Sequence, residues 1–312
     1  MKAVRFDRLG GPEVLRVEDV PVPEPEAGQV RLRVAGVGFN PADGGIRAGT
    51  LPFPVVLPHI PGYDVAGVVD ALGEGVEGLA VGDRVVGFLS MTDDGASAEY
   101  AIAPADVLVT APAAGDLADA AALPSVGLTA WQALFDLGGL QRDQRVLIVG
   151  AGGTVGGYAV QLAADAGAHV VATASPRSRA AVEAAGAREI VDHTATAVGE
   201  AVSEPVDLLL NLAPIEPTEF AALVGLVRDG GAVVSTTAWM PTPGDDARDV
   251  RSATAFVRSD AAQLARLVAL VDEGRLHLPA SRRIGFGELA DVHAAAADGS
   301  LRGKVVLVPA LG

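Results

Sequence analysis

The chain contains no cysteine among its 312 residues. This absence excludes disulfide bonds, thiolate catalysis and any zinc or iron–sulfur site held by cysteine. Lysine is nearly absent as well, because only Lys2 and Lys304 occur, and acidic side chains outnumber basic ones to give a formal net charge of −16. A charge of this sign argues against nucleic acids and anionic membranes as partners.

Long hydrophobic runs are also missing, although half of the residues are hydrophobic. No run reaches the length of a membrane span, and the N-terminal MKAVRFDRLG lacks the apolar core of a signal peptide. We therefore expect a soluble cytoplasmic protein with no membrane partner. The length is sufficient for two domains, each with its own core.

The most informative stretch is residues 146–175, VLIVGAGGTVGGYAVQLAADAGAHVVATAS. Its pattern predicts a buried strand, a glycine-rich turn, an amphipathic helix and a second buried strand. Glycine permits positive φ angles and a close approach of pyrophosphate, and the helix that follows offers unpaired N–H groups to the phosphates. We predict that a dinucleotide binds here, at Gly150, Gly152, Gly153, Thr154, Val155 and Gly156.

The end of the second strand indicates which dinucleotide is bound. NAD-binding units place a carboxylate there for the ribose 2′-hydroxyl, whereas this chain continues SPRSR over residues 175–179. Hydroxyl and guanidinium groups suit a 2′-phosphate, so Ser175, Arg177 and Arg179 predict NADP as the cofactor. The structural alternative is that Ser175 caps a helix beginning at Pro176, with the arginines in its solvated first turn.

Two patterns divide the chain. Residues 1 to about 120 read as short strands separated by glycine and proline turns, which predicts a small barrel-like β domain. From about residue 123, apolar strands alternate with helices, which predicts a parallel, doubly wound sheet with strands at 146–149, 170–173, 189–191, 206–210 and 232–235. Beyond residue 259 the pattern predicts a helix over 260–273, a segment at 283–286, a helix from residue 288 and a final strand over 305–308, whose place it does not fix. In the doubly wound sheet, residues that end central strands are expected to contact the cofactor: Asn211, Leu212, Ala213, Ser235 and Thr236.

Seven segments, in order, carry a resemblance that covers nearly the whole chain: GVGFNPADGGIRAG (36–49), IPGYDVAGVV (60–69), VGDRVVGF (81–88), LPSVGLTAWQAL (123–134), VGAGGTVGGYAVQLA (149–163), VDEGRLHLP (271–279) and RGKVVL (302–307). Through them the chain resembles the medium-chain dehydrogenase/reductase superfamily and, within it, the zinc-free quinone oxidoreductase branch that includes zeta-crystallin-like proteins. The resemblance implies a Rossmann-type NADP-binding domain over residues 122–258. This domain would be inserted in a GroES-like, mostly β catalytic domain over 1–121 and 259–312.

Zinc-dependent members of that superfamily hold catalytic zinc with a cysteine, a histidine in a Gly-His-Glu segment and a further cysteine or carboxylate. By the resemblance, Asn40 stands at the position of the first cysteine and Tyr63 at that of the histidine, and the four-cysteine loop of a structural zinc is missing. An amide, a phenol and scattered carboxylates make a poor tetrahedral zinc site, so no metal is expected. We interpret the nearby His59 as a loop residue.

Without a metal, hydride transfer to an electron-poor acceptor asks least of the protein. The resemblance implies an NADPH-dependent, zinc-independent reductase of a small molecule, either a quinone or an α,β-unsaturated carbonyl. Asn40 is a candidate amide donor or a residue that only holds its loop, and Tyr63 is a candidate phenolic donor or a packing residue. Thr129 is a candidate for both catalysis and cofactor contact, or an ordinary helix-start hydroxyl. Asp43 is expected to fix its loop.

One departure from the resemblance keeps other functions open. Many quinone reductases carry a tyrosine two residues after the loop aspartate, where this chain has Gly45, so an aromatic ring that could stack on a quinone is lost. The alternatives are an enoyl-thioester reductase of secondary metabolism and a non-catalytic NADPH-binding sensor or partner protein. Relatives often dimerise by joining their nucleotide-domain sheets edge to edge. We therefore expect a homodimer, with residues 232–238 either as the edge strand that pairs or, equally, as a strand covered by local structure.

Overall fold

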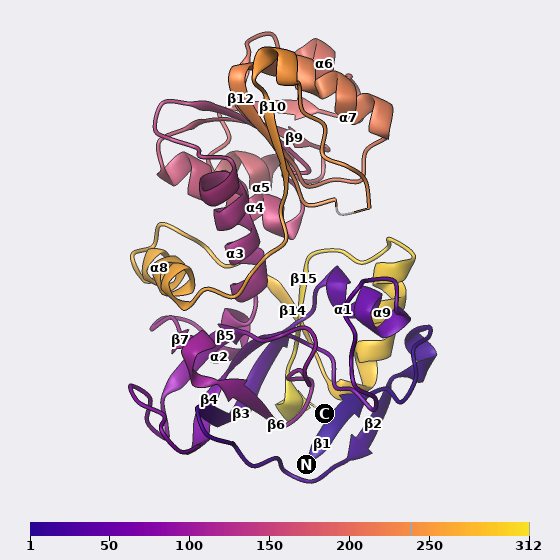
Figure 1. Ribbon diagram of the computed structural model, residues 1–312, viewed down its shortest axis with the longest axis vertical. Helices are drawn as coiled ribbons and strands as arrows, with labels where there is room; N and C mark the ends of the chain where they lie inside the picture. The colour runs from indigo at the N-terminus through magenta and orange to yellow at the C-terminus, as the bar shows by residue number, and fades with distance from the viewer. Residues whose placement is uncertain (238, 312) are drawn as a thin grey trace. The chain divides into compact units, whose positions relative to one another are not determined.

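In the computed structural model, which describes residues 1–237 and 239–311, the chain folds into two compact units (Figure 1). The first unit holds residues 1–125, 259–274 and 278–312, and the second holds residues 126–258 and 275–277. Within the described part of the chain, no helix is both long enough and apolar enough to cross a membrane.

The second unit is built on a six-stranded parallel sheet in the order β10-β9-β8-β11-β12-β13. The central strands are almost wholly apolar and buried, as parallel strands covered on both faces must be. From β8 the strands are added outward in one direction to β10, and from β11 in the other direction to β13. The carboxyl ends of β8 and β11 are therefore the topological switch point of the sheet. The predicted doubly wound sheet is confirmed. Its strands are β8 (Arg145–Val149), β9 (His169–Ala174), β10 (Glu189–Asp192), β11 (Val206–Asn211), β12 (Val227–Ser235) and β13 (Arg251–Thr254).

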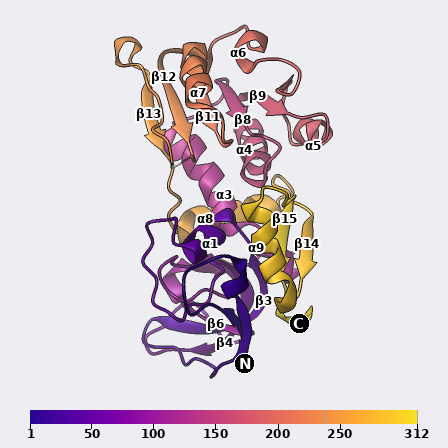
Figure 2. The same cartoon turned by 90° about the vertical axis from the view of Figure 1, so that its right-hand side faces the viewer.

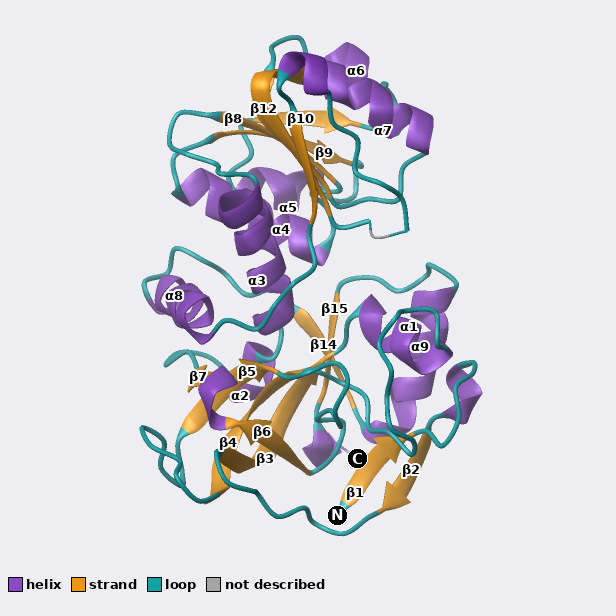
Figure 3. Cartoon of the chain, viewed as in Figure 1, coloured by secondary structure: helices purple, strands orange, loops and turns teal. Residues whose placement is uncertain are grey.

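Helices lie on both faces of this sheet, as Figure 3 shows, with α4 and α5 on one face and α6 and α7 on the other. Their bounds are α4 (Thr154–Asp165), α5 (Arg179–Ala184), α6 (Val198–Ala201) and α7 (Pro217–Leu223). Helix α3 (Pro124–Trp131) continues as a π-helical segment over Gln132–Leu137. The sequence pattern did not indicate this change from α-helix to π-helix. Such segments are rare in proteins, and those that occur are often found at functional sites.

The strand expected to form a sheet edge does not form one. Strand β12 is paired on both sides, with β11 and with β13, so β13 is the outermost strand. The expectation that residues 232–238 supply a free edge is therefore wrong for the strand itself, and Ala238 lies outside the described residues. The sequence did not predict β13, because this strand is short and begins with the polar residues Arg251 and Ser252.

The first unit is mainly antiparallel, with the strand order β14-β15-β3-β4-β5-β7 and β6 also paired with β3. Valines and leucines alternate inward along β3, so the predicted face of Val30, Leu32 and Val34 is buried. The final strand, which the pattern could not place, lies beside β3 (Figure 2). The strands are β1 (Lys2–Arg5), β2 (Arg16–Asp19), β3 (Gln29–Gly38), β4 (Asp64–Leu72), β5 (Arg84–Phe88), β6 (Tyr100–Pro104), β7 (Leu108–Thr110), β14 (Ser281–Ile284) and β15 (Lys304–Leu307).

Helices of the first unit are α1 (Pro41–Ala48), α2 (Leu117–Ala120), α8 (Ala261–Asp272) and α9 (Leu289–Ala297). The predicted helix over 260–273 is confirmed, since Asp260 caps α8 by accepting a hydrogen bond from the Gln263 N–H at 3.0 Å. The segment expected at 283–286 is shifted, because β14 ends at Ile284. Helix α1 packs against α9, which brings the N-terminal and C-terminal parts of the chain together.

Candidate functional site

The glycine-rich turn joins β8 to α4 in the second unit. Gly150 adopts a φ of +87°, and a Cβ placed on it would lie 3.1 Å from the Ala213 side chain, so glycine is required there. The Gly150 N–H donates to Thr173 Oγ1 at 2.9 Å, which ties the turn to β9. Gly153 stands at the N-cap of α4, and Thr154 is its first residue, so the helix presents its N-terminus directly after the turn.

Two adjacent glycines of α4 differ in what surrounds them. A Cβ on Gly156 would lie 2.4 Å from the Gly150 carbonyl oxygen and 2.6 Å from Ala151 Cα. A Cβ on Gly157 would meet nothing within 4 Å. Gly156 therefore permits the close packing of helix against turn, whereas Gly157 has no steric role.

The segment after β9 folds beside this turn. A Cβ on Gly152 would lie 2.6 Å from Ser178 Oγ, and Ser178 Oγ accepts the Ser175 N–H at 3.2 Å. The regular part of helix α5 begins at Arg179, three residues later than the alternative of a helix starting at Pro176 requires. The Ser175 carbonyl nevertheless accepts the N–H groups of Ser178 and Arg179, both at 3.0 Å, so a turn precedes the helix as that alternative expected. Arg177 and Arg179 are exposed, and within the described residues neither forms an ion pair.

The carboxyl ends of β11 and β12 lie next to the turn. Asn211 is fully buried; its Nδ2 donates to Ser235 Oγ at 3.4 Å and its Oδ1 accepts the Ala213 N–H at 3.3 Å. The Leu212 N–H donates to Val149 O at 2.9 Å, and the Thr236 N–H donates to Asn211 O at 3.1 Å. The structure thus brings together the strand-end residues that the sequence singled out.

Thr129 lies elsewhere in the second unit, on helix α3 just before the π-helical segment. It lines a cavity of about 140 Å³ together with Gln132, Asp136, Leu137 and residues 255–258. The Gln132 side chain holds the backbone of Arg258 from both sides, accepting its N–H at 3.1 Å and donating to its carbonyl at 3.0 Å. The wall of this cavity is therefore fixed by hydrogen bonds.

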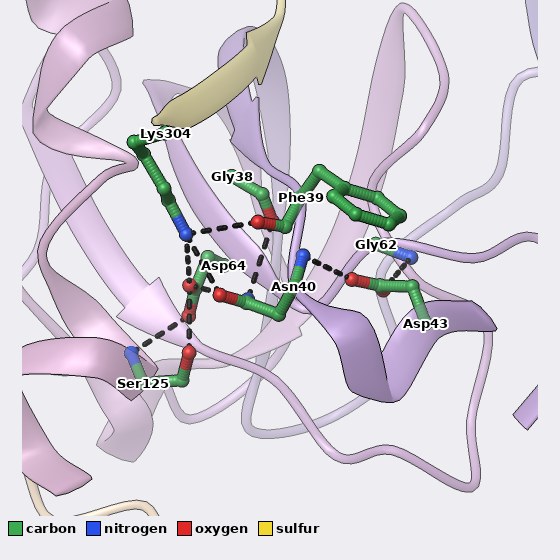
Figure 4. Close-up of polar contacts among 8 residues, drawn as sticks. All are labelled: Gly38, Phe39, Asn40, Asp43, Gly62, Asp64, Ser125 and Lys304. Atoms are coloured by element: carbon green, nitrogen blue, oxygen red, sulfur yellow. Dashed lines mark hydrogen bonds and ion pairs between the residues drawn. The ribbon is translucent and has the colours of Figure 1, made fainter. Parts of the chain in front are cut away.

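A buried polar cluster occupies the first unit (Figure 4). Lys304, at the start of β15 and 3% exposed, donates from Nζ to Asn40 Oδ1 at 2.8 Å and to Phe39 O at 3.1 Å, and its Nζ lies 3.5 Å from Asp64 Oδ2. Asp64 is fully buried and accepts the Ser125 N–H at 2.8 Å and the Ser125 hydroxyl at 2.7 Å. Burial lowers the pKa of Lys304, and Asp64 and Asp43 oppose that effect.

The amide of Asn40 is fully engaged in this cluster. Its Oδ1 accepts from Lys304, and its Nδ2 donates to Asp64 Oδ2 at 2.8 Å and, more weakly, to Gly38 O at 3.4 Å. An amide offers two donors and one carbonyl acceptor, so each has a protein partner. Of the two interpretations of Asn40, these contacts favour the residue that holds its loop.

Asp43 fixes the start of helix α1, as expected. Its carboxylate accepts the Asn40 N–H at 2.7 Å, in a capping box, and the Gly62 N–H at 3.0 Å. Burial raises the pKa of Asp43 to about 7, against the opposing effect of the Asn40 hydrogen bond. Asp43 thereby ties the Asn40 loop to the segment that carries Tyr63.

Tyr63 and His59 form a separate buried pair. The Tyr63 hydroxyl lies 2.8 Å from His59 Nε2, and His59 Nδ1 lies 3.6 Å from the exposed carboxylate of Asp94. Both rings are at most 2% exposed. Burial raises the pKa of Tyr63 and lowers that of His59, so both are neutral near pH 7. His59 is therefore more than a loop residue, because it connects a phenol to a surface carboxylate.

A further polar pair lies between α1 and α9 without hydrogen-bond partners. Nε and Nη1 of Arg47 and both ring nitrogens of His293 are buried and unpartnered within the described structure. His293 stacks edge-on against Phe39, with ring centroids 4.9 Å apart, and lines a void of about 10 Å³ with Asp43 and Ser97. That void has room for about one water molecule. Burial and the nearby Arg47 lower the pKa of His293 to about 3.

Sequence reasoning missed three members of the buried cluster: Asp64, Ser125 and Lys304. A usable signal existed for Lys304, because it is one of two lysines and opens an otherwise apolar strand, KVVLV. A lysine at such a position needs a buried counter-charge. Nothing local, however, pointed from Lys304 to Asp64.

Comparisons with known proteins agree with this architecture. Residues 26–113 match the family described as the alcohol dehydrogenase GroES-like domain, and residues 185–307 match the family described as zinc-binding dehydrogenase. The chain is 34% identical to the chloroplast envelope quinone oxidoreductase homolog of Arabidopsis thaliana, with 99% of this chain and 98% of that protein covered.

Solved structures give the same picture. The quinone oxidoreductase of Coxiella burnetii superposes with a TM-score of 0.87 at 31% identity, and the cobalt- and zinc-bound thermostable alcohol dehydrogenase of Pyrobaculum aerophilum with a TM-score of 0.85 at 27% identity. Each comparison covers 99% of both chains. This chain is an oxidoreductase that belongs to the medium-chain dehydrogenase/reductase superfamily, a family that uses nicotinamide cofactors, and to its quinone oxidoreductase-like branch.

Proposed function

We propose that the chain is an NADPH-dependent, metal-independent reductase that passes a hydride to a quinone or an α,β-unsaturated carbonyl. The observation that carries the cofactor part is the segment after β9, which holds two exposed arginines and two serines and no carboxylate, and whose Ser178 lies against Gly152 of the glycine-rich turn. Hydroxyl and guanidinium groups suit the 2′-phosphate of NADP. The carboxylate that would accept hydrogen bonds from the ribose hydroxyls of NAD is missing. The relatives named as quinone oxidoreductases support the substrate class.

The residues of the chain do not fit a zinc ion. Cysteine is absent, and the described residues contain no group of three or more His, Cys, Asp or Glu side chains that could hold a metal. The Asn40 amide is occupied by Lys304 and Asp64, and the neutral phenol of Tyr63 is not a ligand of the kind that zinc prefers. Zinc prefers sulfur and imidazole ligands in a tetrahedron, which this set does not supply. Although zinc-bound structures share the fold, we therefore propose chemistry without zinc.

Hydrogen-bond donors carry the catalytic part of the proposal. When bound, a reduced nicotinamide supplies a hydride, and the charge that develops on the acceptor oxygen needs a donor. We assign this role first to Tyr63, whose phenol stays protonated. In the tautomer in which His59 Nε2 carries the proton, His59 donates to the phenol oxygen, so the phenol proton is free for the acceptor. His59 Nε2 then replaces the proton that Tyr63 gives up, and His59 Nδ1 takes one from solvent on the side of Asp94. Thr129 is assigned to the nicotinamide, and Asn40 to the position of its loop.

Cofactor preference tests the first part. We expect NADPH to bind more tightly than NADH, and Arg177→Ala to weaken NADPH binding about tenfold or more while leaving NADH unchanged, because a charge-assisted pair to phosphate contributes about 1.5–3 kcal/mol. Fluorescence titration with both nucleotides measures this. Equal dissociation constants for NADPH and NADH would refute the preference.

Turnover tests the second part. NADPH oxidation is followed against a panel of quinones, 2-alkenals and enoyl thioesters, with metal content determined on the same preparation. We expect turnover on quinones or alkenals, about 10²–10⁴-fold lower in Tyr63→Phe and with unchanged NADPH affinity. No turnover on any acceptor, with micromolar NADPH binding intact, would favour a binding protein. Stoichiometric zinc would contradict metal independence.

We also propose a homodimer, now through β13 rather than β12. The outermost strand of a sheet presents unpaired backbone groups, and pairing with a second copy satisfies them. Light scattering on the purified chain measures the mass, and a monomer at micromolar concentration would exclude this arrangement.

A further inference from the structure

The ammonium group of Lys304 occupies an unusual environment for a lysine. It is surrounded by the backbone carbonyl of Phe39 at 3.1 Å, the amide oxygen of Asn40 at 2.8 Å and a carboxylate oxygen of Asp64 at 3.5 Å. Lys304 is 3% exposed and Asp64 is not exposed at all. All three groups around Nζ are therefore oxygens held in the interior, and Figure 4 shows them converging on one atom.

These oxygens are the kind that hard metal ions bind. Carboxylate, amide and backbone carbonyl oxygens are the protein ligands of Mg²⁺, Mn²⁺ and Ca²⁺. The oxygens are also fixed: Ser125 holds the Asp64 carboxylate through its N–H and its hydroxyl, and Asn40 is clamped through its own Nδ2 and N–H. Such a set would need a positive charge at its centre even if Lys304 were absent, because Asp64 is buried.

We propose that the ammonium group of Lys304 is the resident cation of this oxygen-lined site, and that its presence keeps a metal ion out. Removal of the whole lysine side chain would open a site for a hard divalent cation, held by Asp64, Asn40 and the Phe39 carbonyl. The metal-independence proposed above then has a cause in this chain, a lysine that fills the cation position, in addition to the missing cysteines.

The test uses the full-length chain with Lys304→Ala, which frees the space of both the stem and the charge. Equilibrium dialysis and electron paramagnetic resonance with Mn²⁺ count the bound metal. We expect about one Mn²⁺ per chain in Lys304→Ala and none in the unchanged chain. We also expect the Tm of the variant, and not that of the unchanged chain, to rise by several degrees as Mn²⁺ is added.

Two matched variants separate this effect from a general loosening of the unit. Lys304→Met removes the charge but keeps the stem in place, so it should bind no Mn²⁺. Lys304→Ala combined with Asp64→Asn opens the space but removes the carboxylate, so it should also bind none. Mn²⁺ binding that is equal in the single and the double variant would overturn the proposal, as would its absence in a folded Lys304→Ala protein.

Failure to fold also gives a definite answer. If Lys304→Ala folds only when a cation is supplied, its refolding yield with Mn²⁺ or methylammonium, compared with sodium alone, becomes the measurement. A higher yield with those cations supports the proposal, and equal yields overturn it. None of these measurements depends on reductase turnover. The cation site and the proposed function can therefore fail separately, since zinc in the unchanged chain would contradict the latter whatever Lys304→Ala binds.

Discussion

The glycine-rich turn of the second unit and the buried polar cluster of the first unit are built in opposite ways. The turn is formed by backbone groups of residues 150–156, and its close packing depends on glycines that have no side chain. The cluster consists of side chains from Asn40, Asp64, Ser125 and Lys304, each partnered by another. Adding a methyl group should therefore disrupt the turn, whereas removing a charge should disrupt the cluster.

Removal of the cluster's cation should have the largest effect on stability. Lys304→Met leaves the Asp64 carboxylate buried without its counter-charge, and loss of one partner of a buried pair costs about 3–5 kcal/mol. Guanidinium denaturation of the full chain measures the shift in the free energy of unfolding. Adding Asp64→Asn to Lys304→Met should recover a large part of the loss. A single variant as stable as the unchanged chain would show that the cluster is not built on charge pairing.

Addition of one methyl group to the turn should have the next largest effect. Gly156→Ala places a Cβ against the Gly150 carbonyl, and relief of that overlap costs about 1–3 kcal/mol, or about 5- to 150-fold in nucleotide affinity if it is taken from the binding conformation. Gly157→Ala is the matched control one residue away. Its Cβ meets nothing within 4 Å, and alanine favours the helix by about 1 kcal/mol. Similar NADPH affinities in the two variants would contradict a turn defined by close packing.

The unpartnered His293 sharpens the comparison through acid sensitivity, whose effect on stability near pH 7 is the smallest of the three. Its folded-state pKa of about 3 lies below the ordinary value of 6.5, so between these values the unfolded chain takes up a proton that the folded chain does not. Stability should therefore fall as the pH drops from about 6.5 to about 3, by at most about 1.4 kcal/mol per pH unit from this group. His293→Leu should flatten that part of the stability curve, and parallel curves for the two proteins would argue against a buried neutral histidine.

The contrast between the two sites also explains what could be predicted from sequence. The turn, α4 and strands β8, β9, β11 and β12 were predicted because each depends on residues that are close in the chain and on a regular apolar pattern. The strand-end residues Asn211 and Ser235 were predicted because parallel strands bring their carboxyl ends to one edge.

What was not predicted depends on distant side chains or on local departures from regular geometry. The hydrogen bond between Lys304 and Asn40 joins residues that are 264 positions apart, and hydrophobic periodicity does not predict contacts at such a separation. The π-helical segment after α3 and the start of α5 at Arg179 are set by local hydrogen bonds, such as that between Ser178 and Ser175. The pairing of β13 with β12 was not predicted because β13 is short and begins with polar residues.

The position of β15 beside β3 has a consequence for how the protein is made. Asn40 and Asp64 leave the ribosome long before Lys304, which follows Asn40 by 264 residues. Until then the growing chain holds an uncompensated carboxylate where the finished protein has an ion pair, and the sheet of the first unit lacks β15 and β14 at one side. The second unit, which lies almost entirely between these segments in sequence, is complete earlier. Synthesis of the C-terminal strand is therefore the event that completes the first unit, and truncations before Lys304 should yield chains in which only the second unit resists proteolysis.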